Sequence, residues 1–258
     1  MSLFLQVNDE SRDHVIAELW EQGTLGITEE GSGLRAFFKD DRDTEELLAT
    51  FEAFQPSLMR EDDRDWVADV KAAWPSTEVG DRWFLVPEWS DEQAPPGRTR
   101  LTIFPGMASG SGWHSATRLC LEAMERVDLE QQRVLDLGTG SGILAHAASL
   151  SGARSIGCDI DHDSTMVAAE NTRRYGLPVG FFTGSLRSVR AGSVDVLVAN
   201  INAATIEQLA LEFNRVSPAH MILAGFREDE VERVLNAVGR QASTMLEEIG
   251  WACVVISG

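Results

Sequence analysis

The 258-residue chain has few cysteines, few basic residues and no long apolar run. Its three cysteines, Cys120, Cys158 and Cys253, are widely spaced, with no CxxC pair and no histidine placed to complete a metal site. This spacing excludes a disulfide framework and a thiolate zinc site. The sequence therefore predicts three buried free thiols and no metal.

No apolar stretch approaches the roughly 20 residues that span a bilayer, and the N-terminus lacks a basic segment followed by an apolar one. We therefore expect no membrane association and a cytoplasmic location. A hydrophobic content of 43% with 24% charged residues is typical of a globular protein. The length favours two domains or one large one.

Basic residues are scarce, because 41 acidic residues stand against 22 basic ones, giving a net charge of −19. Such a surface repels a phosphate backbone, so stable nucleic-acid binding is not expected. A basic protein would be attracted to it. The alternative is that the charge serves solubility alone.

The first 60 residues alternate short strand-like and helix-like segments. We expect strands at 4–7, 24–29 and 34–38 and helices at 14–21 and 44–54. This β-α-β-β-α order predicts a small α+β domain of the ferredoxin-like kind at residues 1–60.

Residues 61–98 contain an acidic stretch, a tryptophan-rich strand and a Pro-Pro-Gly break, and we interpret them as a linker region. They include four tryptophans: Trp66, Trp74, Trp83 and Trp89. In so acidic a chain, apolar anchoring of one domain on another is favoured over base stacking.

The third segment, 99–258, begins with a predicted helix at 116–127 and then alternates strands and helices. Strands are expected at 133–137, 155–159, 179–183, 194–199 and 220–224, and helices at 143–150, 163–174, 203–213 and 229–238. This alternation predicts a doubly wound α/β fold, a parallel sheet with helices on both faces. The segments 243–248 and 251–256 are expected to add a hairpin to the sheet edge.

A glycine-rich loop follows the first of these strands, with Gly138, Gly140 and Gly142 ahead of the helix. Glycines permit positive φ and close approach of a ligand, and the helix start offers unpaired N–H groups. The dinucleotide motif G-x-G-x-x-G would need glycine at Ile143, and no Gly-Lys-Ser/Thr follows for a phosphate loop. The carboxylate of Asp136 opposes phosphate and suits a cationic ligand, such as the ammonium of a methionine moiety.

Two further strands end in polar residues. Asp159 comes 21 residues after Gly138, at a position where a carboxylate accepts ribose hydroxyls. Asp161 and Asp163 are more typical of helix caps. Asn200 alone would suggest a turn, but strands of a parallel sheet end at the same crevice, so we expect it beside Asp159 and the glycine loop.

Taken together, these residues resemble the PrmA-type methyltransferases, which methylate the eleventh protein of the large ribosomal subunit. The similar stretches are FPGMASGSGWHSATRLCLE (104–122), VLDLGTGSGILA (134–145), GCDID (157–161) and VANI (198–201). LWEQGTLG (19–26) and DWV (65–67) look like the family's substrate-recognition domain and linker.

This resemblance implies a class I methyltransferase with a seven-stranded, mostly parallel sheet and S-adenosyl-L-methionine as cofactor. The residues it assigns to the cofactor are Thr117, Asp136, Gly138, Gly140, Gly142, Asp159 and Asn200. Gly138 would lie under the methionine part and Asp159 would hold the ribose, while Asn200 near the transferable methyl would be the catalytic residue. The implied acceptor is an amine, on a lysine side chain or an N-terminus of a basic ribosomal protein.

The chain departs from the family pattern in two loops. Ser109 and Ala116 replace the usual Phe and Thr of the loop before the sheet, and Asn202-Ala203-Ala204 is unusual after the fourth strand. A methyltransferase acting on another protein or a small molecule, and a non-catalytic cofactor-binding protein, therefore stay open as alternatives. His114 is either a base or a structural loop residue.

Overall fold

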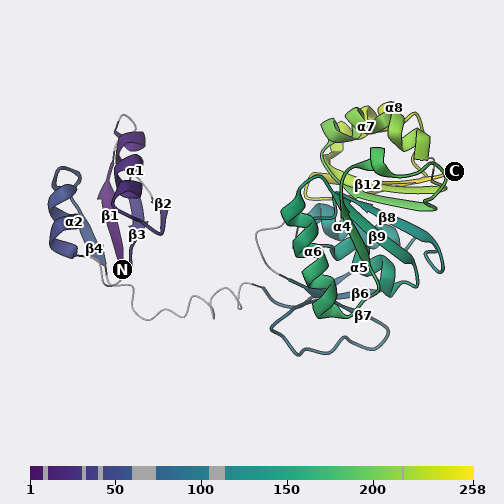
Figure 1. The fold of residues 1–258 in the computed structure, drawn as a ribbon, viewed down its shortest axis with the longest axis horizontal. Helices are drawn as coiled ribbons and strands as arrows, with labels where there is room; N and C mark the ends of the chain where they lie inside the picture. The colour runs from purple at the N-terminus through teal and green to yellow at the C-terminus, as the bar shows by residue number, and fades with distance from the viewer. Residues whose placement is uncertain (8–10, 31–32, 40–42, 60–73, 105–113, 217) are drawn as a thin grey trace. The chain divides into compact units, whose positions relative to one another are not determined.

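The computed structural model describes the chain except residues 8–10, 31–32, 40–42, 60–73, 105–113 and 217. The chain divides into two compact units, Met1–Ala72 and Ala73–Gly258 (Figure 1). Among the described residues, no helix is long and apolar enough to cross a membrane.

The described part of the first unit contains an antiparallel sheet and the helices α1 and α2. Its elements are β1 (Ser2–Gln6), α1 (Arg12–Glu21), β2 (Gly26–Glu30), β3 (Gly33–Phe37), α2 (Thr44–Thr50), η1 (Glu52–Phe54) and β4 (Ser57–Met59). The strands lie in the order β2-β3-β1-β4, with all neighbours antiparallel. The predicted β-α-β-β-α succession is present, and β4 is a strand that the sequence pattern missed. Leu3 and Leu5 of β1 and Val15 and Leu19 of α1 are fully buried and form its core.

A small three-stranded sheet opens the second unit. It consists of β5 (Thr77–Val79), β6 (Trp83–Pro87) and β7 (Thr99–Ile103) in the order β5-β6-β7. β5 and β6 lie in the segment 61–98, which we interpreted as a linker region with a tryptophan-rich strand; its first part, with Trp66, lies outside the described residues. All five residues of β6 are buried, so this part of the segment forms a strand inside the core and not an exposed connection.

Two tryptophans, Trp74 and Trp83, pack in the core of the second unit beside this small sheet. Trp83 is fully buried, and its Nε1 donates to the carbonyl of Leu121 at 3.1 Å. Trp74 packs against the same core. Burial of a tryptophan with its N–H bonded is the favourable arrangement for this side chain.

The main sheet has seven strands in the order β10-β9-β8-β11-β12-β14-β13, parallel except for β14. The strands are β8 (Arg133–Leu137), β9 (Arg154–Asp159), β10 (Gly180–Thr183), β11 (Val196–Asn200), β12 (His220–Arg227), β13 (Thr244–Glu248) and β14 (Trp251–Ser257). The helices are α4 (Ser115–Met124), α5 (Ile143–Leu150), α6 (His162–Tyr175), η2 (Leu186–Ser188), α7 (Ala203–Val216), η3 (Glu228–Glu230) and α8 (Val231–Val238). The doubly wound fold and the terminal hairpin are confirmed.

Alternate residues of each central strand serve two separate cores. Val196 and Val198 of β11 join the core under α4 and α5, whereas Leu197 and Ala199 join the core under α7 and α8. Successive strand residues point to opposite faces, so a sheet covered on both sides needs apolar residues at every position. Cys120, Cys158 and Cys253 are buried free thiols, as predicted.

Candidate functional site

The candidate site lies where β8, β9 and β11 end. The glycine loop follows β8, Asp159 is the last residue of β9, and Asn200 is the last of β11. The strand order reverses between β8 and β11, since β9 lies on one side of β8 and β11 on the other. A crevice at such a reversal is the usual ligand site of open α/β sheets.

The three loop glycines all have positive φ, at +74° for Gly138, +51° for Gly140 and +87° for Gly142. This region of φ strains every residue with a side chain. A Cβ at Gly138 would also lie 2.6 Å from Cγ2 of Ile201. The loop conformation therefore requires glycine for its backbone angles and, at Gly138, for space.

Backbone hydrogen bonds tie this loop to β9. The amides of Gly138 and Thr139 both donate to the carbonyl of Cys158, at 2.8 and 3.0 Å, and the amide of Gly142 donates to Thr139 at 2.8 Å. From α6, Nδ2 of Asn171 donates to the carbonyl of Ser141 at 2.9 Å. The second half of the loop thus has a side-chain support that its own sequence did not reveal.

Asp136 lies beneath the loop and is 1% exposed. Its Oδ2 accepts from Oγ1 of Thr139 at 2.7 Å and from the amide of Ala145 at 3.1 Å. Burial raises the pKa of this carboxyl to about 6, against the opposing effect of those two hydrogen bonds. Oδ1 has no hydrogen-bond partner within the described part of the chain. Asp136 therefore joins the loop to the first turn of α5 through Oδ2, and its buried Oδ1 is left as an unpaired acceptor.

Asp159 is held from both sides by backbone amides. Its Oδ2 accepts from Gly140 at 3.1 Å and its Oδ1 from Asp161 at 3.1 Å. Each carboxylate oxygen has a second lone pair, so the group can still accept from a diol. Asp161 caps α6 through the amides of Asp163 and Ser164, as its position predicted.

Asn200 and Thr117 meet across 83 residues of sequence. Nδ2 of Asn200 donates to Oγ1 of Thr117 at 3.0 Å, and Thr117 is 1% exposed. The bond joins the end of β11 to the first turn of α4. The structure thus brings together two residues that the sequence linked only through a family resemblance.

His114 is the N-cap of α4, where its Nδ1 accepts from the amide of Ala116 at 3.3 Å. A ring nitrogen that accepts carries no proton, so the neutral ring is protonated at Nε2. The ring stands edge-on to Trp251, with centroids 4.5 Å apart. These contacts describe a structural cap, and the substituted loop before it, including Ser109, lies outside the described residues.

These groups fit S-adenosylmethionine. The three glycines of the loop admit close approach of its methionine part, and the unpaired Oδ1 of Asp136 suits a cation. The Asp159 carboxylate is fixed by two backbone amides and keeps lone pairs that can accept from a ribose diol. Among the described residues, no cluster of three or more His, Cys, Asp or Glu side chains could hold a metal ion.

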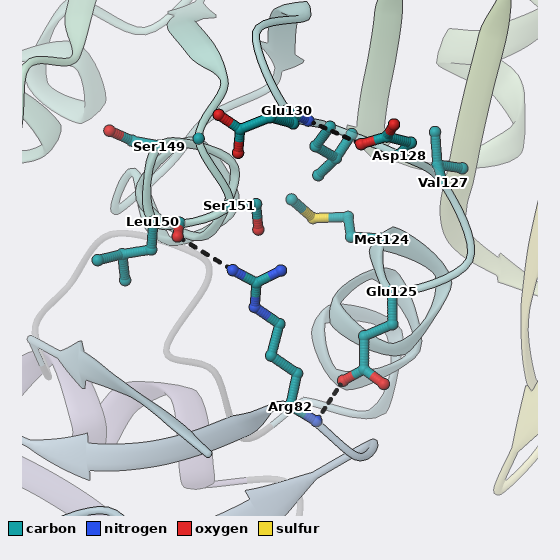
Figure 2. A pocket seen from close by; sticks show the side chains of 11 residues that line it. Arg82, Met124, Glu125, Val127, Asp128, Glu130, Ser149, Leu150 and Ser151 are labelled. Atoms are coloured by element: carbon teal, nitrogen blue, oxygen red, sulfur yellow. Dashed lines mark hydrogen bonds between the residues drawn. The ribbon is translucent and has the colours of Figure 1, made fainter. Parts of the chain in front are cut away.

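A cavity of about 410 Å³ lies at the opposite ends of the strands, where α4 and α5 finish (Figure 2). Arg82 enters it and donates from Nη2 to the carbonyl of Leu150 at 3.1 Å, while Glu125 accepts the amide of Arg82 at 3.0 Å. The polar groups there satisfy one another. The cavity belongs to the packing of the small sheet and not to the candidate site.

The chain is similar to known proteins over most of its length. A family model described as ribosomal protein L11 methyltransferase (PrmA) matches residues 4–257. The ribosomal protein L11 methyltransferase of Deinococcus radiodurans is 37% identical over 245 residues, which cover 91% of this chain and 88% of that protein. That of Geobacter sulfurreducens is 34% identical, covering 86% and 80%.

The solved structures agree. The crystal structure of the ribosomal protein L11 methylase of Lactobacillus delbrueckii subsp. bulgaricus is 28% identical, with a TM-score of 0.66, and the match covers 71% of this chain and 98% of that one. The chain therefore belongs to the ribosomal protein L11 methyltransferases, a family of S-adenosylmethionine-dependent N-methyltransferases built on the class I fold.

Proposed function

We propose that this protein methylates amino groups of a basic ribosomal protein, the counterpart of L11, in the cytoplasm. The observation that carries the proposal is the Asn200–Thr117 bond beside the glycine loop, which puts an oriented amide at the carboxyl end of the sheet. The net charge of −19 supports a basic acceptor, because opposite charge accelerates encounter.

The cofactor set consists of Thr117, Asp136, Gly138, Gly140, Gly142, Asp159 and Asn200. S-adenosylmethionine supplies, when bound, an electrophilic methyl group on a sulfonium. Asp159 would hold the ribose, and the glycine loop would admit the methionine part, with Asp136 as its anchor.

Asn200 is the proposed catalytic residue. The donation from Nδ2 to Thr117 fixes the orientation of the amide, and its Oδ1 is an acceptor suited to an amine N–H. Desolvation of a lysine ammonium favours its neutral form, and alignment against the methyl group contributes up to about 7–11 kcal/mol to the barrier reduction in well-oriented cases. No strong base is needed under this scheme, and His114, as a helix cap, is not assigned that role.

The first unit is the proposed substrate-recognition domain, a ferredoxin-like fold spanning about residues 1–60. Its element order supports the fold assignment. Trp20 and Leu25 are 55% and 62% exposed, and large exposed apolar side chains favour a protein contact. The proposed methyltransferase domain is 99–258, and β5 and β6 support it through the small sheet that they form with β7.

Two measurements test the function. Calorimetry of S-adenosylmethionine with the wild type and Asp159→Ala should give binding that the substitution weakens by about a hundredfold or more, as expected for loss of charged hydrogen bonds. Asp163→Ala, a carboxylate in the same turn region, is the control and should bind normally. No binding to the wild type would overturn the proposal.

The acceptor is then identified by transfer of labelled methyl from S-adenosylmethionine. Purified ribosomal protein L11 should be labelled at amines, with Asn200→Ala lowering the rate by a much larger factor than it lowers the affinity for S-adenosylmethionine. Labelling of other proteins or small amines instead would favour the alternative acceptor class suggested by Ser109 and Ala116. Cofactor binding without turnover on any amine would favour a non-catalytic protein.

A further inference from the structure

Three side chains form a stack at the end of the sheet next to the candidate site. The guanidinium of Arg227, the last residue of β12, lies over the ring of Trp251 at 4.3 Å from its centroid. Trp251 is the first residue of β14 and pairs with Arg227 in the sheet. His114 packs against the same indole at 4.5 Å, inclined by 73°.

The stack leads to Asn200 through the first turn of α4. The amide of Thr117 donates to the carbonyl of His114 at 2.9 Å, so the cap fixes the residue one turn later. Oγ1 of Thr117 then accepts from Nδ2 of Asn200 at 3.0 Å. Arg227, Trp251, His114, Thr117 and Asn200 thus form a continuous series of contacts.

A second contact joins the same hairpin to the same helix. Arg118 pairs with Glu248 at 2.7 Å, with side chains that are 31% and 24% exposed. Glu248 lies opposite Trp251 in the β13–β14 pairing. The hairpin therefore holds the start of α4 at two points, one aromatic and one ionic.

We propose that Trp251 and Arg227 are positioning residues for methyl transfer, a role that rests on the proposed function of Asn200. They hold the His114 cap and so set the place of Thr117, which orients the amide of Asn200. Arg227 occupies one face of the indole, which makes the ring a fixed support. A cation over an aromatic face and an edge-on aromatic pair are both attractive. Small displacements of a positioning group cost large factors in rate.

The test measures kcat, the dissociation constant of S-adenosylmethionine and thermal stability in parallel, using purified ribosomal protein L11 as acceptor. Trp251→Leu should lower kcat about tenfold or more, with a smaller factor of change in the dissociation constant, because Asp136, Asp159 and the glycine loop are untouched. Trp251→Phe keeps an aromatic ring and should recover most of the rate. Arg227→Gln, at an exposed side chain, should lower kcat about threefold to tenfold, with thermal stability measured beside it because Arg227 also donates to the Ile249 carbonyl.

Arg233→Gln is the matched control. Arg233 is also an exposed arginine near the start of α8, but it pairs with Glu207 and Glu230 and does not contact Trp251. It should leave kcat unchanged. An unchanged kcat in folded Trp251→Leu and Arg227→Gln would overturn the proposal. A fall in kcat that is proportional to the fall in thermal stability across the variants would overturn it as well.

The ¹⁵N spectrum of the His114 ring gives a readout independent of turnover. In the wild type the neutral ring should carry its proton on Nε2, and Trp251→Leu should shift that tautomer balance. If the wild type transfers no methyl group, the proposed function is wrong. If the ¹⁵N spectrum of His114 is the same in Trp251→Leu as in the wild type, this inference is wrong whatever the outcome for the function.

Discussion

The two ends of the seven-stranded sheet differ in how they treat polar groups. At the amino ends of β8 and β9, Arg82 and Glu125 bond to backbone groups and close a cavity of about 410 Å³ (Figure 2). At the carboxyl ends, Asp136 and Asp159 are fixed by the glycine loop but keep acceptor capacity. The volume of a cavity therefore does not by itself identify the candidate site, whereas fixed polar groups that can still accept hydrogen bonds do.

The reason lies in the direction of the strands. Parallel strands bring loops of several connections to their carboxyl ends, where each contributes one side chain. At the amino ends, the helices α4 and α5 finish and the chain returns to the sheet. The last carbonyls of α5 accept hydrogen bonds there from Arg82 and from backbone amides. One end of the sheet is thus built for a ligand and the other for packing. Four substitution experiments sharpen or break this contrast.

The largest effect is expected from glycines of positive φ at the two ends. Gly138→Ala combines strained φ with a Cβ 2.6 Å from Ile201 and should weaken S-adenosylmethionine binding about a hundredfold, with about 2–5 kcal/mol lost in stability. Gly152→Ala, with φ +83°, meets only the flexible end of Glu130 and should cost about 1–2 kcal/mol with normal binding. Calorimetry and urea unfolding of both variants make the comparison. Equal loss of binding in both would break the contrast.

The next effect concerns pH, through Asp136 and His146. The folded pKa of Asp136 is about 6, above its ordinary 3.8, so its stabilising contribution is present below pH 3.8 and lost as pH rises through 6. Burial lowers the pKa of His146 from 6.5 to about 4, so its contribution is present above 6.5 and lost as pH falls toward 4. Each shift is equivalent to about 3 kcal/mol.

Unfolding free energies between pH 4 and 7.5 separate these two groups. On acidification His146→Gln should gain stability, because only the Asp136 contribution remains, and Asp136→Asn should lose stability, because only the His146 contribution remains. The two opposing contributions overlap between pH 4 and 6, so the wild type changes less than either variant. Curves that run parallel to that of the wild type would contradict the assignment.

A smaller effect is expected from Asn171, which supports the loop from α6. Asn171→Leu removes the donor to the Ser141 carbonyl and should raise the dissociation constant of S-adenosylmethionine about tenfold. Thr165→Val is the matched control, since Thr165 is a buried polar residue of the same helix that bonds to His162 and Thr183. It should lower stability without changing affinity. Equal affinities in the two variants would remove Asn171 from the cofactor loop.

The smallest effect on function is expected at the opposite end. Arg82→Met removes the bond to Leu150 and the guanidinium over the Trp83 ring, and should cost about 1–2 kcal/mol in stability. Cofactor affinity and kcat should stay at wild-type values. A fall in kcat without a fall in stability would mean that the two ends are coupled.

Local patterns predicted the site best where it is contiguous in sequence. The strand, glycine loop and helix from 133 to 150 were predicted at their observed bounds, because apolar periodicity and glycine act within a few residues. The strands β4, β5 and β7 were not: β4 and β5 have only three residues each, and β4 pairs with β1, at the other end of the first unit's sequence. Within 61–98 the predicted tryptophan-rich strand is present as β6, and β5 is the strand that the sequence pattern missed.

Side-chain partnerships were less accessible. Asp136 was expected to face a cationic ligand, and the structure adds that it is almost wholly buried and bonded to Thr139 and Ala145. Asn171 and Trp251 carried no motif that pointed to the site. Contacts of this kind depend on helix packing and strand register, which no local window contains.

The sequence by itself determined the doubly wound succession, the glycine loop and the spacing of Asp159, since each follows from the conformational preferences of neighbouring residues. The tertiary structure alone decided which side chains meet. At Gly225, φ is +94° and the pairing of β12 with β14 shifts register, so that the backbone of β12 closes on Ile201. The β13–β14 hairpin puts Trp251 against His114, which lies more than 100 positions earlier in the sequence. Such contacts depend on tertiary structure because strand pairing is a long-range interaction.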